Sequence, residues 1–166
     1  MRGGMKRSKL GLALVPVIAY VAWPLWSGQQ LKSAILEGDA ATLERKVEWP
    51  SVRTSLKQSL NVYLSQQGVI AQALNAAFGT VVVDKIVENF VSPEGLIQLM
   101  ASPEQRENLS PRHIRWAFFT SPTRFEMTMR PPKYPDTRMI SSFDLGWRGW
   151  VLDWRLASVR VVSAGK

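Results

Sequence analysis

The spacing of hydrophobic residues changes along the chain, and this change limits the folds that the chain can adopt. From Leu31 to Met100 apolar residues recur every three to four positions, as on one face of an α-helix. From Arg112 onward apolar and polar residues alternate over four segments separated by short turns, which is typical of half-buried strands. The sequence therefore predicts an α+β fold. Its helical half precedes a four-stranded antiparallel sheet with helices packed on one side.

Local signals predict where individual elements begin and end. Gly38 and Asp39 separate two helices, the second capped by Asp39. A longer helix opens at Trp49-Pro50, and its apolar pattern continues loosely over residues 69–78. Ser92 caps a short helix that begins at Pro93.

The strand alternation also predicts which aromatic side chains are buried. Trp116 and Phe118 alternate with polar or small residues in the first strand. Trp150 and Trp154 follow the buried phase of the last strand, so we expect both in the core. Trp147 lies in a connection between strands and is expected at the surface.

A basic N-terminus precedes an uncharged apolar segment. Arg2, Lys6, Arg7 and Lys9 come before Leu10–Trp26, which as a helix would extend about 25 Å, close to the roughly 30 Å of a bilayer core. We predict a membrane anchor at residues 10–26, with Pro24 near its end and the basic residues on the inner side. A cleaved secretory signal is the alternative. The predicted division is residues 1–28 for this segment and 29–166 for one domain, helical over 29–109 and a sheet over 110–166.

The net charge of +8 is unevenly distributed along the chain. Residues 1–9 carry +4, residues 10–109 carry −2 and residues 110–166 carry +6. The charge of residues 1–9 is interpreted as a signal that sets membrane orientation, so the net charge of the whole chain does not indicate a nucleic-acid partner. An exported domain would also rarely meet nucleic acid. The chain has no cysteine, which excludes disulfides, thiolate catalysis and cysteine-based metal sites.

The arginines of the predicted sheet are the candidate binding residues. Arg130, Arg138 and Arg155 share the polar phase of their strands, and Trp147 lies beside Arg148 in a connection. One interpretation is a lattice of cross-strand ion pairs. The other is a concave cationic surface that binds a carboxylate, a phosphate or a lipid headgroup.

His113 is the only histidine, so a site with two histidine ligands is excluded. Paired with Asp144 or Asp153 it could form an acid–base unit of a small hydrolase or isomerase. A solvated histidine at a strand edge is the simpler interpretation. No phosphate loop or nucleophile elbow occurs, and we expect no cofactor, no metal and no catalytic residue.

Several short motifs together resemble the DUF2939 family of bacterial proteins. They are Leu31-Lys32-Ser33-Ala34-Ile35 with Gly38-Asp39, Val47-Glu48-Trp49-Pro50 with Arg53, Ser92-Pro93-Glu94-Gly95-Leu96, and part of a final strand from Gly149 to Leu156. The resemblance implies an envelope protein with an N-terminal membrane segment, hence a single-pass protein of the bacterial inner membrane with a periplasmic domain. It supplies no activity and no catalytic residue.

These observations favour a non-enzymatic, membrane-anchored domain that binds a partner in a groove between helices and sheet. Such a layout is similar to cystatin-like or nuclear-transport-factor-like folds, by analogy alone. The expected partner is an envelope protein or an anionic small ligand. The hydrolase or isomerase that uses His113 is the alternative, and the oligomeric state stays open.

Overall fold

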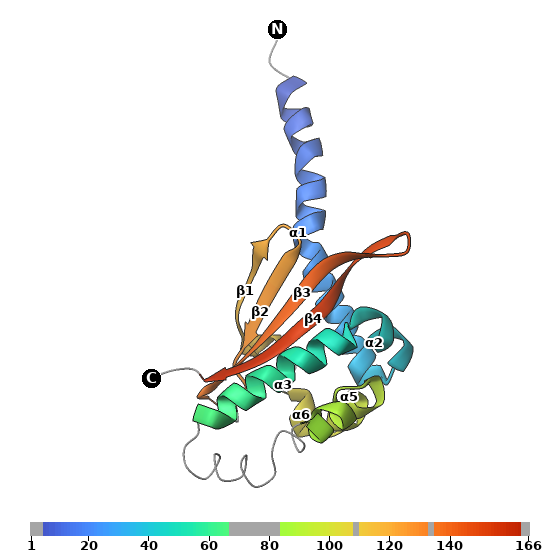
Figure 1. Cartoon of the computed structure of the whole chain (residues 1–166). Coiled ribbons are helices and arrows are strands. Elements are labelled where there is room, and N and C mark those ends of the chain that lie inside the picture. The colour runs from blue at the N-terminus through green and yellow to red at the C-terminus, as the bar shows by residue number, and fades with distance from the viewer. Residues whose placement is uncertain (1–4, 67–83, 108–109, 133–134, 164–166) are drawn as a thin grey trace.

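The computed structural model describes residues 5–66, 84–107, 110–132 and 135–163, with side chains over the same ranges apart from 5–14, 64–66 and 104. The apolar pattern predicted at residues 69–78 lies outside them. The elements are α1 (Met5–Glu37), α2 (Ala40–Lys46), α3 (Trp49–Gln66), α5 (Pro93–Leu99), α6 (Pro103–Glu107), a 3₁₀ turn (Pro111–His113), β1 (Ile114–Ser121), β2 (Arg124–Met129), β3 (Thr137–Arg148) and β4 (Val151–Ser163). Residues 84–90 are also helical. This order confirms the predicted α+β class (Figure 1).

The four strands form one antiparallel sheet in the order β1-β2-β3-β4, as the short turns predicted. Phe125 of β2 lies opposite Phe143 of β3, which in turn lies opposite Leu156 of β4. Residues that lie opposite each other in antiparallel strands point to the same face. These three side chains therefore make one face of the sheet apolar, and all three are buried.

Helix α1 covers this apolar face. The ring of Tyr20 stacks on Phe119 with centroids 5.5 Å apart and lies 6.2 Å from the ring of Trp154, which is completely buried. The Ser27 hydroxyl donates a hydrogen bond of 2.6 Å to the backbone oxygen of Trp154. Pro24 is also fully buried. One face of the half of α1 that follows Tyr20 is thus part of the domain core, while Val21, Leu25 and Trp26 on the other face are exposed.

The course of α1 differs from the prediction in one respect. The helix continues through both Pro16 and Pro24 to Glu37, so Pro24 does not end it. Buried positions recur along the helix every three or four residues, at Pro24, Ser27, Leu31, Ala34 and Ile35. This spacing places them on one stripe that faces the sheet. Burial of that stripe stabilises the helix by more free energy than is lost with the backbone hydrogen bond that each proline removes.

The N-terminal half of α1 projects beyond the sheet (Figure 1). Its described side chains from Val15 to Ala19 are exposed, and most of them are apolar. Among the residues that could be searched, no helix is both long enough and apolar enough to pass through a bilayer, so the predicted spanning helix is not supported.

Helix α3 runs along the outer edge of β4. The backbone N–H of Glu48, just before α3, donates to the oxygen of Leu156 at 2.9 Å, and the N–H of Val159 donates to the Ser55 hydroxyl at 3.1 Å. These bonds occupy polar backbone groups that an edge strand would otherwise leave unpaired. Because α3 also borders the polar face of the sheet, helices are not confined to one side, which corrects the prediction.

The predicted helix starts are confirmed in the structure. Asp39 accepts a hydrogen bond of 3.0 Å from the backbone of Thr42, and Ser92 accepts one of 3.0 Å from Gly95. Gly95 is also tightly enclosed, since a Cβ at this position would overlap the Asn89 oxygen and lie 2.9 Å from Phe90 Cα. Only glycine fits at this position of the Pro-Glu-Gly-Leu turn, because the backbone of Asn89 and Phe90 leaves no room for a Cβ atom.

Candidate binding trough on the polar face of the sheet

The face of the sheet opposite α1 carries polar side chains in rows across the strands. One row is Arg124, Asp144 and Arg155, and the next is Phe118, Glu126, Ser142 and Ser158. A third row consists of Trp116, Thr128, Ile140 and Arg160. Register alone places these residues on one surface, because opposite residues share a face.

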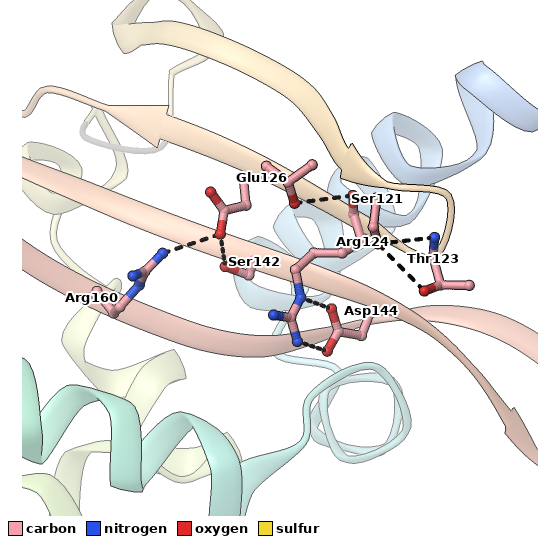
Figure 2. Close-up of polar contacts among 8 residues, drawn as sticks. Ser121, Thr123, Arg124, Glu126, Ser142, Asp144 and Arg160 are labelled. Atoms are coloured by element: carbon pink, nitrogen blue, oxygen red, sulfur yellow. Dashed lines mark hydrogen bonds and ion pairs between the residues drawn. The ribbon is translucent and has the colours of Figure 1, made fainter.

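The charges in these rows are joined in pairs (Figure 2). Arg124 donates two hydrogen bonds to Asp144, from Nε to Oδ1 and from Nη2 to Oδ2, both 2.7 Å long. Glu126 Oε1 accepts from the Ser142 hydroxyl and from Arg160 Nη2, each at 3.1 Å. The hydrogen bonds and charge of Asp144 raise the pKa of the Arg124 guanidinium above its ordinary value. Such bidentate pairing fixes the orientation of both side chains.

An open trough of about 620 Å³ lies between this face and α3. Helix α3 lines it with small polar side chains, and the sheet lines it with the paired charges and two serines. The α3 residues are Ser51, Thr54, Ser55 and Gln58, and the sheet residues are Arg124, Glu126, Ser142, Asp144, Ser158 and Arg160. The hydroxyls of Thr54, Ser55 and Ser142 already donate their protons within the domain, but their oxygens can accept further hydrogen bonds.

The trough continues at both ends. A hollow of about 580 Å³ at the β1–β2 turn shares Arg124, Glu126 and Asp144 with it. A second hollow, of about 390 Å³, shares Ser55, Gln58 and Arg160 with the trough but is lined mainly by apolar surface. We call the three together the polar trough. Its elongated, shallow shape suits an extended chain better than a compact small molecule, which enclosed pockets usually hold.

The structure does not gather the predicted site residues at one place. Arg155 pairs with Glu48 at the start of α3, and its Nε atom has no hydrogen-bond partner within the described part of the chain. Arg138 shares the polar face, but it lies opposite Val162, near the far end of the sheet from Arg155. Arg130 follows β2, and its backbone N–H donates to the His113 oxygen at 3.0 Å.

The sequence did not single out Arg124 and Arg160, although both line the polar trough. The alternation in the sequence does place Glu126 and Asp144 in the polar phase of their strands. The missing information was the register, which sets Arg124 opposite Asp144. The hydroxyls of α3 reach the trough only through tertiary packing, and no local pattern signals that.

The histidine of the alternative enzymatic hypothesis is far from its proposed partners. His113 precedes β1, whereas Asp144 lies beside the β1–β2 turn at the other end of that strand. An eight-residue strand extends about 25 Å, so the two side chains cannot form an acid–base pair. Asp153 lies farther along β3–β4 and pairs instead with Lys46 at 2.6 Å. The hypothesis of a hydrolase or isomerase thus loses its geometric basis.

No metal-binding cluster of three or more His, Asp or Glu side chains occurs within the described residues. The carboxylates of the polar trough point toward arginines, as Figure 2 shows for Asp144 and Glu126. These carboxylates therefore serve as ion-pair acceptors in this structure.

Three tryptophan predictions can be compared with the structure. Trp154 is completely buried, as predicted. Trp150 is 98% exposed, so the prediction of a core position was wrong. The reason is that β4 begins only at Val151 and Trp150 occupies the turn before it. Trp147, expected at the surface, is 69% exposed on β3 near the same turn.

Comparison with known proteins identifies a family. The family model of DUF2939, a protein family of unknown function, matches residues 13–99, just over half of the chain. The chain belongs to the DUF2939 family, as its short motifs indicated. The match covers the helical half, so the likeness of the last strand stays a prediction. No curated protein and no solved structure matches this chain.

Proposed function

We propose that this protein is a membrane-tethered binding protein of the bacterial envelope. The N-terminal part of α1 enters the bilayer of the inner membrane and holds the domain at the membrane surface. The domain lies in the periplasm and binds a partner along the polar trough, without catalysis.

The observation that carries the proposal is the division of α1 into two unlike halves. After Tyr20 one face of the helix is buried against the sheet, while Val21, Leu25 and Trp26 on its other face are exposed. Before Tyr20, Val15, Val17 and Ile18 are exposed and stand beyond the domain. Exposed apolar side chains on a projecting helix are unfavourable in water and favourable in lipid. In the sequence, further apolar residues precede Val15, from Leu10 onward.

The orientation rests on the charges that precede the helix. Arg2, Lys6, Arg7 and Lys9 are the charged residues of the first nine, and all are basic. An excess of Lys and Arg favours the cytoplasmic side of a membrane. This orientation places the domain, which follows the apolar segment, on the periplasmic side.

The partner we propose for the polar trough is an extended segment of another envelope protein. Arg124 and Arg160, the trough's arginines, are each already paired with a carboxylate. Each carboxylate already neutralises the charge of its arginine, so the trough attracts a small anion only weakly. An extended polypeptide can instead hydrogen-bond to the hydroxyls while both ion pairs stay intact.

Fractionation of cells that produce the full-length protein tests the tether. We expect the protein in the membrane fraction after an alkaline carbonate wash, with its domain cleaved by protease added to spheroplasts. Ile18→Lys places a charge on the projecting half of α1 and should shift the protein to the soluble fraction. Gln29→Lys, at an exposed position of the buried half, is the matched control and should remain with the membrane. Recovery of the wild-type protein in the cytosol would refute the proposal.

A further inference from the structure

The hairpin between β3 and β4 has a two-residue turn whose composition the fold does not explain. Arg148 pairs with Val151, so Gly149 and Trp150 alone form the loop. Gly149 has φ +61°, whereas Trp150 does not have a positive φ. This is the pattern of a type II′ turn, which requires glycine at the first position and leaves the second open to small polar residues.

The tip nevertheless exposes three large apolar side chains. Trp150 is 98% exposed, Trp147 69% and Val151 63%. A Cβ at Gly149 would meet no atom within 4 Å, so the tip stands clear of the described remainder of the domain. Clustered exposed apolar side chains in a folded protein indicate a surface that is covered in use.

The charge at the tip is positive. Between Gly146 and Leu152 the sequence has one charged residue, Arg148, and no acid. The next carboxylate, Asp153, is held by Lys46 at 2.6 Å. Tryptophan and arginine together suit the boundary between water and anionic lipid, where the indole ring sits at headgroup depth and the guanidinium reaches the phosphates.

The tip and the free half of α1 leave the sheet at the same end. Toward its N-terminus, α1 passes Phe143 at Gly28 and then Trp154 at Tyr20. Toward the tip, β3 likewise passes from Phe143 to Leu145, which lies opposite Trp154. The hairpin tip therefore lies at the end of the sheet from which α1 projects, although in Figure 1 the hairpin slants sideways, away from the helix.

We propose that the tip of the β3–β4 hairpin is a second membrane contact, which inserts Trp147 and Trp150 into the headgroup region of an anionic bilayer. This inference rests on the proposed tether by α1. The tether brings the domain to the surface, and the hairpin then fixes its orientation relative to the membrane. With two attachment points, the polar trough is held at a constant angle to the bilayer.

Hydrogen exchange on vesicles of phosphatidylethanolamine and phosphatidylglycerol tests the contact, with the full-length protein in each case. Because the tether alone keeps the full-length protein on the vesicles, replacing Trp147 and Trp150 together by serine should leave cosedimentation unchanged. It should instead speed amide hydrogen exchange at the β3–β4 tip of the bound protein roughly tenfold or more, given the apolar area of two indole rings. The matched control replaces two other exposed apolar residues by serine, namely Phe90 and Leu99, which are 47% and 42% exposed. Leu99 ends α5, which packs near the opposite, C-terminal end of α1. The control variant should bind, and its tip should exchange, as in the wild type.

The absence of cysteine allows a second, local measurement. An environment-sensitive dye attached to Trp150→Cys should shift its emission to the blue when the protein is reconstituted in these vesicles. The same dye on Gln98→Cys of α5 should not shift. If the wild type binds vesicles but neither the serine variant nor the dye at position 150 responds, the hairpin contact is refuted and the tether stands. If the wild type does not bind at all, the tether fails and this inference fails with it.

Discussion

Removal of the first 28 residues should strongly destabilise the domain, although the sequence places its start at residue 29. The described contacts extend farther upstream. Tyr20 packs on Phe119 and Trp154, Ser27 donates to the backbone of Trp154, and Pro24 between them is fully buried. A protein comprising residues 29–166 lacks these contacts, whereas one comprising residues 20–166 keeps them. The two truncated proteins both lack the projecting half of α1, so they form a matched pair.

The magnitude follows from three contributions. The two ring contacts of Tyr20 are worth about 1 kcal/mol each beyond their buried area. Full burial of Pro24 contributes about 2 kcal/mol from its ring methylenes. The hydrogen bond of Ser27 contributes about 1 kcal/mol. The free energy of unfolding should therefore fall by about 5 kcal/mol, a large share of the roughly 5–15 kcal/mol typical of a domain.

Urea denaturation followed by circular dichroism measures the difference. With a denaturant slope of about 2 kcal/mol per molar, the midpoint of residues 29–166 should lie roughly 2–3 M below that of residues 20–166. Equal midpoints with equal slopes would show that the N-terminal contacts contribute nothing, and the assignment of Tyr20–Ser27 to the core would then be wrong.

Three further substitutions test local features of the fold. Gly95→Ala should lower the free energy of unfolding by about 2–4 kcal/mol, because the new Cβ overlaps backbone atoms, whereas Gly28→Ala should change it by less than about 1 kcal/mol in the same urea assay. Asp39→Ala should lower the urea midpoint at pH 7. The hydrogen bonds at the start of α2 hold the pKa of Asp39 below its ordinary 3.8, so its contribution is present above that value, and the difference should shrink as the pH falls below about 4. Arg124→Lys breaks the bidentate geometry with Asp144 at an exposed site and should cost less than about 1 kcal/mol, and a loss of several kcal/mol in thermal unfolding would contradict this.

Much of the fold could be predicted because its determinants are local. The change from helical to alternating spacing near Arg112 reports which elements form, and the short turns leave a meander as the simplest topology. The caps at Asp39 and Ser92 depend on hydrogen bonds that span three residues. Such signals are readable without knowledge of the tertiary structure.

The first strand shows where local pattern is insufficient. Register shifts occur between Ile114 and Trp116 and again between Phe119 and Ser121. A displacement of one residue moves a side chain to the other face of a sheet. Phe119 consequently faces the core, whereas Phe118 lies opposite Glu126 on the polar face and is exposed.

The candidate site was less predictable for a related reason. Alternation indicates that Arg155 and Asp144 share a face, but it does not indicate which carboxylate each arginine meets. Arg155 pairs with Glu48, more than one hundred positions earlier in the sequence. The two interpretations, a cationic surface and a lattice of ion pairs, involve the same arginines. Which of them holds depends on tertiary contacts that the sequence pattern does not reveal. For Arg124, Arg155 and Arg160 the structure shows the ion pairs.

The hydrogen bond between Ser27 and Trp154 joins residues 127 positions apart. During synthesis, the sheet-facing stripe of α1 therefore emerges from the ribosome long before β4 exists to cover it. Loop closure over such a separation is slow compared with local helix formation. Helix α1 is translated before the sheet but is accordingly among the last elements to find its place, and throughout that interval its apolar stripe lacks the partner that buries it in the folded domain.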